Sequence, residues 1–290
     1  MSGPDIAVPP GIRRAVHPLT ATTARVVDHL GTLLRMSAAT VGRSILLTGA
    51  IIGFLGRDLI RGRVPAGEFA QQAWHLLKVT AVPAVLMAIP FGAVVSVQVG
   101  GLVQQVGASS LTGAASGLGI IREGAPLAAG LLLGGAAASA VAADLGARAI
   151  REELDAMRVM GVDPVQRLVV PRCLALLAIA PALLIFIVMV AVGSAYIVAV
   201  RVSDVSRGSF WASFGSFATT TDLVFAVIKT VVAAALVAII AGLRGLEAHG
   251  GPRGVADAVN SSVVLSVTMI IFAALLITQL QTMFFPGQLA

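Results

Sequence analysis

The sequence predicts an all-α polytopic membrane protein with an N-terminal interfacial amphipathic helix, five transmembrane helices and a short helix in a cytoplasmic loop. Hydrophobic residues make up 57% of the chain and charged residues only 12%, with a mean hydropathy of +0.95. About a quarter of an average soluble domain is charged. Because a membrane span needs about 20 apolar residues, the decisive observation is a set of long stretches without Asp, Glu, Lys or Arg. They cover residues 79–121, 124–143, 173–200 and 258–290, and a fifth, 223–243, is interrupted only by Lys229.

The distribution of basic residues predicts the orientation of the spans. With the spans placed at the five ranges given at the end of this paragraph, 16 of the 20 Lys and Arg residues fall in three segments on one side. Cytoplasmic loops are enriched in basic residues, so we expect a multi-pass protein of the plasma (inner) membrane with a cytoplasmic N-terminus and an external C-terminus. The net charge of +6 then reflects topology, and we expect no nucleic-acid partner. The predicted spans are 79–100, 123–143, 173–200, 223–243 and 260–285.

The N-terminal segment, residues 25–57, is amphipathic, with apolar residues at helical spacing on one side and charged residues on the other. Its most apolar part, 45–56, holds twelve residues between two arginines. That length is short for a span and favours a helix lying in the membrane interface. The alternative, a sixth span, would place the C-terminus inside. We divide the chain into residues 1–74, an N-terminal cytoplasmic segment with the interfacial helix, and residues 75–290, the membrane domain.

Small residues recur every four positions in two of the spans, which gives flat strips for close helix contact. The second strip fits equally well with packing inside one subunit and with contact to a second subunit. The strips are Gly92, Ser96 and Gly100 in the first span and Gly130, Gly134, Ala138, Ala142 and Gly146 in the second.

No motif for catalysis or cofactor binding accompanies the spans. A Walker A loop, HExxH, CxxC and GxSxG are all missing from the sequence. The four histidines are scattered, and the one cysteine, Cys173, is assigned no chemistry, so we predict no metal site. We expect a non-catalytic chain without a cofactor of its own.

The exception to the low charge is the segment "REELDAMRVMGVDPVQRLVVPR", residues 151–172, in which eight of 22 residues are charged. Acidic residues in its first turns predict a short helix that ends at Asp163 and Pro164. Leu154 and Met157 share one face with Met160 or Gly161, which predicts an apolar ridge bordered by charges that docks a soluble partner. The alternative is a solvated loop that only fixes topology.

The region "GAPLAAGLLLGGAAASAVAADLGARAIREELDAMRVMGVDPVQRLVVPR", residues 124–172, resembles the signature of the MlaE/YrbE family, permease subunits of ABC-type lipid transporters that work with MCE-domain proteins. "REGAP" (122–126), "DLVFAVIKTVV" (222–232) and "GLEAHGGPRGVADAVNSSVV" (245–264) also resemble family blocks in the family's order, so the likeness covers about 75–290. Of the basic residues, 18 are Arg and two are Lys, which makes the chain most similar to an actinobacterial Mce-operon YrbE protein.

The resemblance implies a set of partners and a role for the charged segment. The partners are a cytoplasmic ABC ATPase that carries ATP and Mg, a second YrbE-type permease in a heterodimer or a homodimer, MCE-domain proteins and a lipid substrate. The charged segment is similar to the family's coupling helix, which contacts the ATPase. The resemblance assigns this contact to Glu152, Glu153, Asp155, Met157, Arg158, Met160, Gly161, Asp163 and Pro164.

Three further charges have two interpretations each. Glu123, after Arg122, is either an N-terminal cap at the outer start of the second span or, together with Arg122, part of the mouth of a lipid cavity. Lys229 lies six residues past Leu223, so it either extends its ammonium group to the interface or serves the substrate path.

Two other classes of function remain as alternatives. An ATP-independent secondary transporter or channel for hydrophobic substrates would need ion-coupling carboxylates near the midplane or an inverted repeat, and the sequence displays neither. A scaffold that only anchors MCE proteins would leave the methionine-bearing charged segment unexplained.

Overall fold

Five long helical segments run through the part of the chain that the structure describes. This structure is a computed structural model, and it describes residues 42–51, 53–54 and 66–284. Four of these segments each contain a predicted span, and the fifth contains all of its predicted span except residue 285, which lies outside the described residues. All regular structure in the described residues is helical. The prediction of an all-α polytopic membrane protein is therefore confirmed. The segments long and apolar enough to cross a membrane are Phe69–Gln105, Ser109–Ile150, Val165–Arg201, Thr220–Leu246 and Pro252–Phe284.

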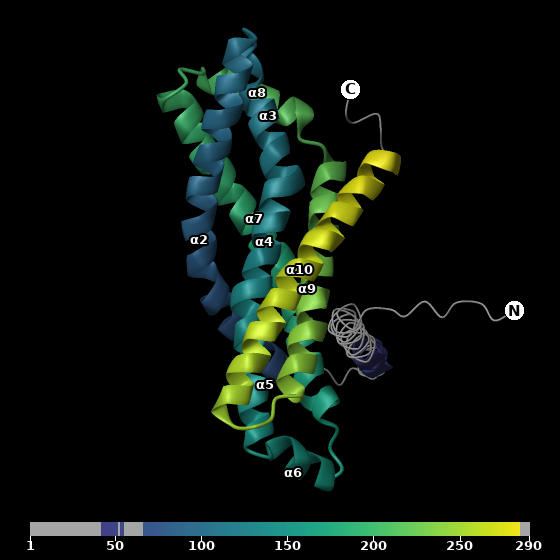
Figure 1. Ribbon diagram of the computed structural model, residues 1–290. Coiled ribbons are helices and arrows are strands. Elements are labelled where there is room, and N and C mark those ends of the chain that lie inside the picture. The colour runs from purple at the N-terminus through teal and green to yellow at the C-terminus, as the bar shows by residue number, and fades with distance from the viewer. Residues whose placement is uncertain (1–41, 52, 55–65, 285–290) are drawn as a thin grey trace, which may run out of the picture. The chain divides into compact units, whose positions relative to one another are not determined.

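Some spans combine several helices (Figure 1). The first span lies in α2 (Ala66–Gln105), and the second combines a 3-10 turn (Ser109–Leu111) with α3 (Thr112–Leu118), a π-helical segment (Gly119–Gly124), α4 (Ala125–Leu132), a second π-helical segment (Leu133–Ala137) and α5 (Ala138–Ile150). The remaining elements are α6 (Glu153–Val159), a π-helical turn (Val165–Val169), α7 (Val170–Arg201), α8 (Arg207–Phe217), α9 (Thr220–Leu246) and α10 (Pro252–Phe284).

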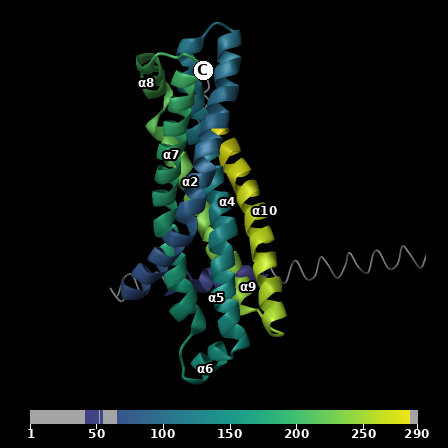
Figure 2. The ribbon, with the colours of Figure 1, turned by 90° about the vertical axis from the view of Figure 1, so that its left-hand side faces the viewer.

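The two short helices α6 and α8 lie at opposite ends of the bundle, as Figures 1 and 2 show. Helix α5 leads into α6 at one end, and α7 leads away from it toward α8 at the other. These ends are called the α6 end and the α8 end below.

The small-residue strip of the first span packs against α7. A Cβ atom added at Gly92 would lie only 2.1 Å from the carbonyl oxygen of Ala191, so only glycine fits at this helix crossing. One turn further on, the hydroxyl of Ser96 donates a hydrogen bond of 2.9 Å to the carbonyl oxygen of Ala195. The strip therefore lets two helix backbones approach closely.

The strip of the second span also makes its contacts inside the chain. A Cβ atom added at Gly130 or Gly134 would lie within 3 Å of the Ile270 side chain on α10, and one at Gly146 would meet Val255 on the same helix at 3.2 Å. Of the two interpretations of this strip, the structure supports packing within one subunit.

The second span begins earlier than predicted, at Ser109 instead of residue 123. The predicted spans left residues 101–122, which are rich in Gly and Ser, as the connection between the first and second spans. Those small residues instead let α3 pack on α8, since a Cβ atom at Gly113 would lie 2.1 Å from the carbonyl oxygen of Phe210. One at Gly117 would lie 2.5 Å from the ring of Phe214.

Helix α8 was not predicted, and aromatic side chains join it to α7. Tyr196 on α7 and Phe210 meet edge to face with ring centroids 5.4 Å apart, and Trp211 lies 5.4 Å from the same Tyr196 ring. The hydroxyl of Ser206 accepts a hydrogen bond of 3.2 Å from the backbone N–H of Ser209 and so caps the helix. Such caps supply an acceptor for the free N–H groups of a first turn.

The N-terminal predictions fall largely outside the described residues. The chain divides into two units, residues 1–46 and 47–290. Residues 42–51 are helical, and Leu47 and Ile51 are buried in the core of the second unit. The interfacial position of 25–57 stays a prediction. The domain boundary after residue 74 also stays a prediction, and α2 passes through it without interruption.

Candidate functional site

The α6 segment, residues 151–164, has a defined local structure at the α6 end. Glu152 adopts φ +60° and Gly161 φ +75°, and these two left-handed residues bracket the short helix. The carboxylate of Asp163 accepts a hydrogen bond of 2.8 Å from the backbone N–H of Val165 and so starts the next helical turn. The predicted helix is confirmed. Its end was placed wrongly, because the turn at Gly161 ends it at Val159.

The apolar residues exposed on the α6 segment are not all the ones that were predicted to form its ridge. Leu154 is 4% exposed and packs inward, so it is not part of an external ridge. Met157 is partly buried. The exposed large apolar side chains are Val159 at 89%, Met160 at 70% and Val162 at 39%. The ridge prediction assumed one continuous helical face, whereas the helix ends before Met160.

Most of the residues assigned to the ATPase contact lie on the surface. Glu153 and Met157 are partly buried and Pro164 is buried. Within the segment, Arg158 and Asp155 form an ion pair of 2.7 Å. The exposed residues are Glu152, Asp155, Arg158, Met160, Gly161 and Asp163.

A second group of charges, the intramembrane cluster, lies among the spans. The ammonium group of Lys229 donates hydrogen bonds of 2.8 Å to the Glu123 carboxylate and to the carbonyl oxygen of Arg122. The Lys229 side chain is 2% exposed. It lies nine residues, or about 13 Å, along α9 from Thr220. Lys229 therefore turns inward to a partner and does not extend to the interface. The cluster consists of Arg122, Glu123, Asp222, Lys229, Thr278 and Gln281.

Glu123 is not a helix cap, and that interpretation is wrong. It lies in the π-helical segment Gly119–Gly124, inside a span that begins at Ser109. Its carboxylate accepts hydrogen bonds of 3.1 and 3.2 Å from the hydroxyl of Thr278 on α10. Arg122 and Glu123 were expected to lie at a helix end, where charges are common in membrane proteins. They lie within the span and contact residues of α9 and α10.

Asp222 is a member of the cluster that the sequence reasoning missed. Its carboxylate lies 3.8 Å from the Arg122 guanidinium and accepts a hydrogen bond of 3.1 Å from the amide of Gln281. The hydroxyl of Thr219 caps α9 by accepting from the backbone N–H of Asp222. The spacing Thr219-x-x-Asp222 is a helix-start pattern, and it could have predicted the cap on α9. No sequence pattern indicates that Asp222 contacts Arg122 and Gln281.

The cluster joins two carboxylates and two cations, so its formal charge balances. Two of its polar atoms, Arg122 Nη2 and Gln281 Oε1, are buried without a hydrogen-bond partner in the described structure. Glu123 keeps 39% of its side chain exposed. Charges inside a membrane are costly and mark substrate or ion paths, and π-helical turns are frequent at functional sites. The arrangement can therefore bind a polar group without a change in its own net charge.

Within the described ranges, no group of three or more His, Cys, Asp or Glu side chains is placed to hold a metal ion. The prediction that the chain has no cofactor of its own stays a prediction.

Comparison with known proteins identifies the family. The family model described as Permease MlaE matches residues 69–280. A probable ABC transporter permease protein of Rickettsia prowazekii is 29% identical over 163 residues, which cover 56% of this chain and 63% of the relative. The chloroplastic protein trigalactosyldiacylglycerol 1 of Arabidopsis thaliana is 30% identical over 63% of this chain and 51% of its own.

Coverage differs among the relatives. The chain spans about half to two thirds of the length of the two relatives above. The intermembrane phospholipid transport system permease protein MlaE of Haemophilus influenzae is 29% identical over 227 residues, 77% of this chain and 85% of that protein. The family match covers most of the membrane-spanning part of the chain. This chain belongs to the MlaE permease family.

Proposed function

We propose that this chain is the transmembrane subunit of an ATP-driven lipid transporter that works with MCE proteins. It forms a lipid path with a second permease and couples to a cytoplasmic ATPase, a separate chain that binds ATP and Mg. The observation that carries the proposal is membership of the MlaE permease family over residues 69–280. The name of the Haemophilus influenzae relative, a phospholipid transport permease, supports a lipid as the substrate.

The α6 segment is the proposed contact with the ATPase. It presents exposed Val159 and Met160 beside the charged pair Asp155 and Arg158. An apolar side chain flanked by charges suits a groove in a soluble partner, where the apolar residue supplies buried area and the charges set orientation. The resemblance of residues 151–164 to the family's coupling helix supports the same assignment.

Arg122, Glu123 and Lys229 are the proposed substrate path. Glu123 is accessible, and the Arg122 guanidinium has one buried nitrogen with no partner. A lipid headgroup with an acceptor oxygen would satisfy that nitrogen, and the apolar walls of the spans would hold its acyl chains. Lipid co-purified with the chain and identified by mass spectrometry tests this proposal. Arg122→Gln should reduce the lipid retained, and Arg201→Gln, an exposed arginine near the α8 end, should not.

The second permease completes the path in this proposal. The dimer is either a homodimer or a heterodimer of two different YrbE-type permeases. The proposed actinobacterial origin of the chain favours the heterodimer. The paired permeases would enclose the lipid, with MCE proteins on the external side. Cross-linking in native membranes followed by mass spectrometry distinguishes the two kinds of dimer.

The decisive experiment tests the ATPase contact with Met160→Glu. This change places a carboxylate on an exposed apolar residue and should cost little folding stability, because the side chain is 70% exposed. We expect the variant to lose most ATPase co-purification and most lipid-stimulated ATP hydrolysis. The matched control is Val106→Glu, which introduces the same charge at an exposed apolar residue, 77% exposed. It follows the end of α2 at Gln105, where Gln104 contacts Ser203 between α7 and α8. Unchanged association in Met160→Glu would contradict the proposal.

The alternative function, an ATP-independent secondary transporter or channel, would require carboxylates that bind and release ions. Glu123 and Asp222 are intramembrane carboxylates, but Lys229 lies 2.8 Å from the first and Arg122 lies 3.8 Å from the second. A fixed cation beside each carboxylate favours the ATP-driven transporter, because it competes with the coupling ion. Transport by the chain alone, without an ATPase, would support the alternative.

The orientation is also proposed: a cytoplasmic N-terminus and α6 end, with the C-terminus outside. A reporter fused after residue 290 tests it, since an inside signal would mean that residues 41–56 span the membrane.

A further inference from the structure

We propose that four alternating charges, Glu153, Arg148, Asp144 and Arg172, connect α6 mechanically to the first turn of α7. This inference rests on the proposed docking function of the α6 segment and names the positioning residues through which that docking moves the spans. The four side chains come from α6, α5, α5 and α7 in that order. The family resemblance assigned a role only to Glu153.

The first link joins α6 to α5. The Arg148 guanidinium lies 3.5 Å from the Glu153 carboxylate. Arg151 also pairs with Glu153 at 3.4 Å and donates a hydrogen bond of 3.1 Å to the carbonyl oxygen of Ala147 on α5, but it forms no ion pair with Asp144 in the described structure. Glu152, between α5 and α6, holds a left-handed φ of +60°, a conformation that costs a non-glycine residue energy. The ion pairs of Glu153 with Arg148 and Arg151 hold α6 against α5 across this turn.

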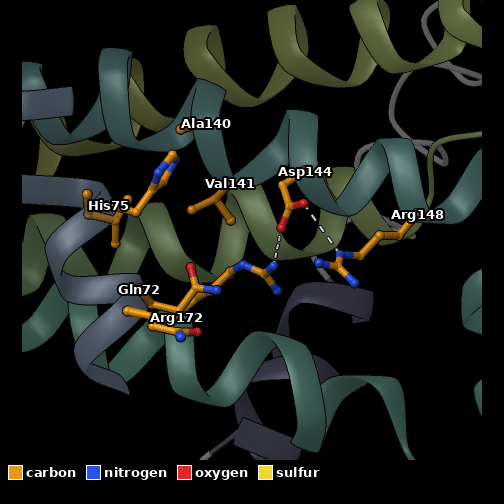
Figure 3. A pocket seen from close by; sticks show the side chains of 9 residues that line it. Gln72, His75, Ala140, Val141, Asp144, Arg148 and Arg172 are labelled. Atoms are coloured by element: carbon orange, nitrogen blue, oxygen red, sulfur yellow. Dashed lines mark hydrogen bonds and ion pairs between the residues drawn. The ribbon is translucent and has the colours of Figure 1, made fainter. Parts of the chain in front are cut away.

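The second link joins α5 to α7. The Asp144 carboxylate pairs with Arg148 at 3.4 Å through one oxygen and with Arg172 through the other. Figure 3 shows Asp144 between the two guanidinium groups, with a dashed line to each. Arg172 is 4% exposed and also donates a hydrogen bond of 2.7 Å to the carbonyl oxygen of Leu168. A buried guanidinium held on two sides fixes the start of α7 relative to α5.

The chain of charges also borders a cavity of about 280 Å³ that reaches the first span. Gln72 and His75 from α2 line the cavity together with Asp144 and Arg172 (Figure 3). A shift of the Asp144–Arg172 pair changes the space between α2, α5 and α7. Movement of α6 therefore reaches the second and third spans through ion pairs and the first span through the cavity that these pairs border.

The solvent exposure of three of the four side chains distinguishes a mechanical connection from a contribution to folding stability. Asp144, Arg148 and Glu153 are each 35 to 44% exposed, and ion pairs at such positions contribute little to folding stability. Arg148→Gln should therefore leave the fold intact and weaken only the connection, which makes it the informative variant.

The first test measures hydrogen–deuterium exchange of the full chain in nanodiscs, with no partner present. Arg148→Gln should raise the exchange rate by about threefold both in α6 and in residues 168–174, as expected for loss of a coupled pair. Arg148→Lys, which keeps the charge, should restore most of the protection. Arg151→Gln is the matched control, because it removes an arginine that pairs with Glu153 but lies outside the chain of four. Its effect should stay within α6.

The second test uses the transporter assembled with its ATPase. Arg148→Gln should keep ATPase co-purification at the native level and lose most of the lipid-stimulated hydrolysis, whereas Met160→Glu loses the association itself. Unchanged exchange at residues 168–174, or an equal effect of Arg151→Gln there, would overturn the proposed connection. Failure of the native chain to bind an ATPase would overturn the proposed function instead, and the exchange comparison in nanodiscs would still decide the connection.

Discussion

Two charged regions of the described structure, the α6 segment and the intramembrane cluster, differ in how far their side chains are exposed to solvent. Asp155 and Arg158 in the α6 segment pair with each other over 2.7 Å and are 70% and 61% exposed. Lys229 in the cluster is 2% exposed and has Glu123 and a carbonyl oxygen as partners from another span. The same kinds of residue thus have separate consequences. Exposed pairs are free to contact a partner, whereas buried ones hold the helices in register.

The two regions also differ in how far apart along the chain their interacting residues lie. In the α6 segment, Asp155 and Arg158 are three residues apart on one helix, so local sequence supplies the pair. In the intramembrane cluster the partners are 59 to 155 residues apart in the chain. A change in the cluster therefore disturbs several helices together.

The largest effect is expected from Lys229→Met, which leaves Glu123 among the spans without its cation. Breaking a buried ion pair by removing one partner destabilises a protein by about 3 to 5 kcal/mol, and the partial exposure of Glu123 favours the lower end. Reversible unfolding in mixed micelles measures the loss. Ile228→Met, at the neighbouring exposed position, is the matched control and should change stability little.

A double variant separates the charge from the shape of the side chain. Adding Glu123→Gln to Lys229→Met removes both charges, so the loss should shrink by about 1 kcal/mol or more relative to Lys229→Met. Losses that simply add would mean that the two residues do not stabilise each other, and the contrast between the regions would fail.

A smaller loss of folding stability is expected from Gly92→Ala. This variant tests whether close helix packing contributes as much to stability as the buried ion pair does. The added methyl group would meet the Ala191 backbone at 2.1 Å, and overpacking of this kind costs about 1 to 3 kcal/mol. Gly101→Ala on the same helix has open space around its Cβ position. It should be neutral or stabilising, because alanine is the better helix former. Equal unfolding energies for the two variants would refute the close approach of α2 and α7.

The smallest change in stability is expected from Asp155→Asn in the α6 segment. Unfolding energy should stay within about 0.5 kcal/mol of the native value, as for most surface substitutions. ATPase co-purification should fall by about threefold, because a charge at the rim of an interface contributes modestly. Asp257→Asn, an exposed charge on α10, provides the control. A large loss of stability in Asp155→Asn would remove the distinction between the two regions.

Hydropathy was sufficient to find the five spans, because each contains an apolar stretch that only a membrane accommodates. The α6 segment stood out because it concentrates charge in a chain that is otherwise poor in charged residues. Where the second span begins was missed, since Gly113 and Gly117 in α3 suit either a loop or a close helix contact. The choice depends on α8, which lies about 95 residues further along the chain.

The intramembrane cluster could be predicted only in part. Lys229 and Glu123 were identified because charge is rare in spans, but their pairing depends on how α9 packs against the second span. The hydroxyl of Thr278 completes the site from α10, and no local pattern distinguishes it from other threonines. The chain of four charges at the α6 end was missed for the same reason, because Asp144 and Arg172 are joined across two helices.

The π-helical segment Gly119–Gly124 has one consequence for insertions and deletions. A π turn accommodates one residue more than an α turn, so deleting a single residue there would regularise the helix. Everything beyond it would keep its register, because the α turn that replaces the π turn absorbs the missing residue. The same deletion within α4 would instead rotate everything beyond it by about 100°, one residue's share of an α-helical turn, and Gly146 on α5 would then point away from α10.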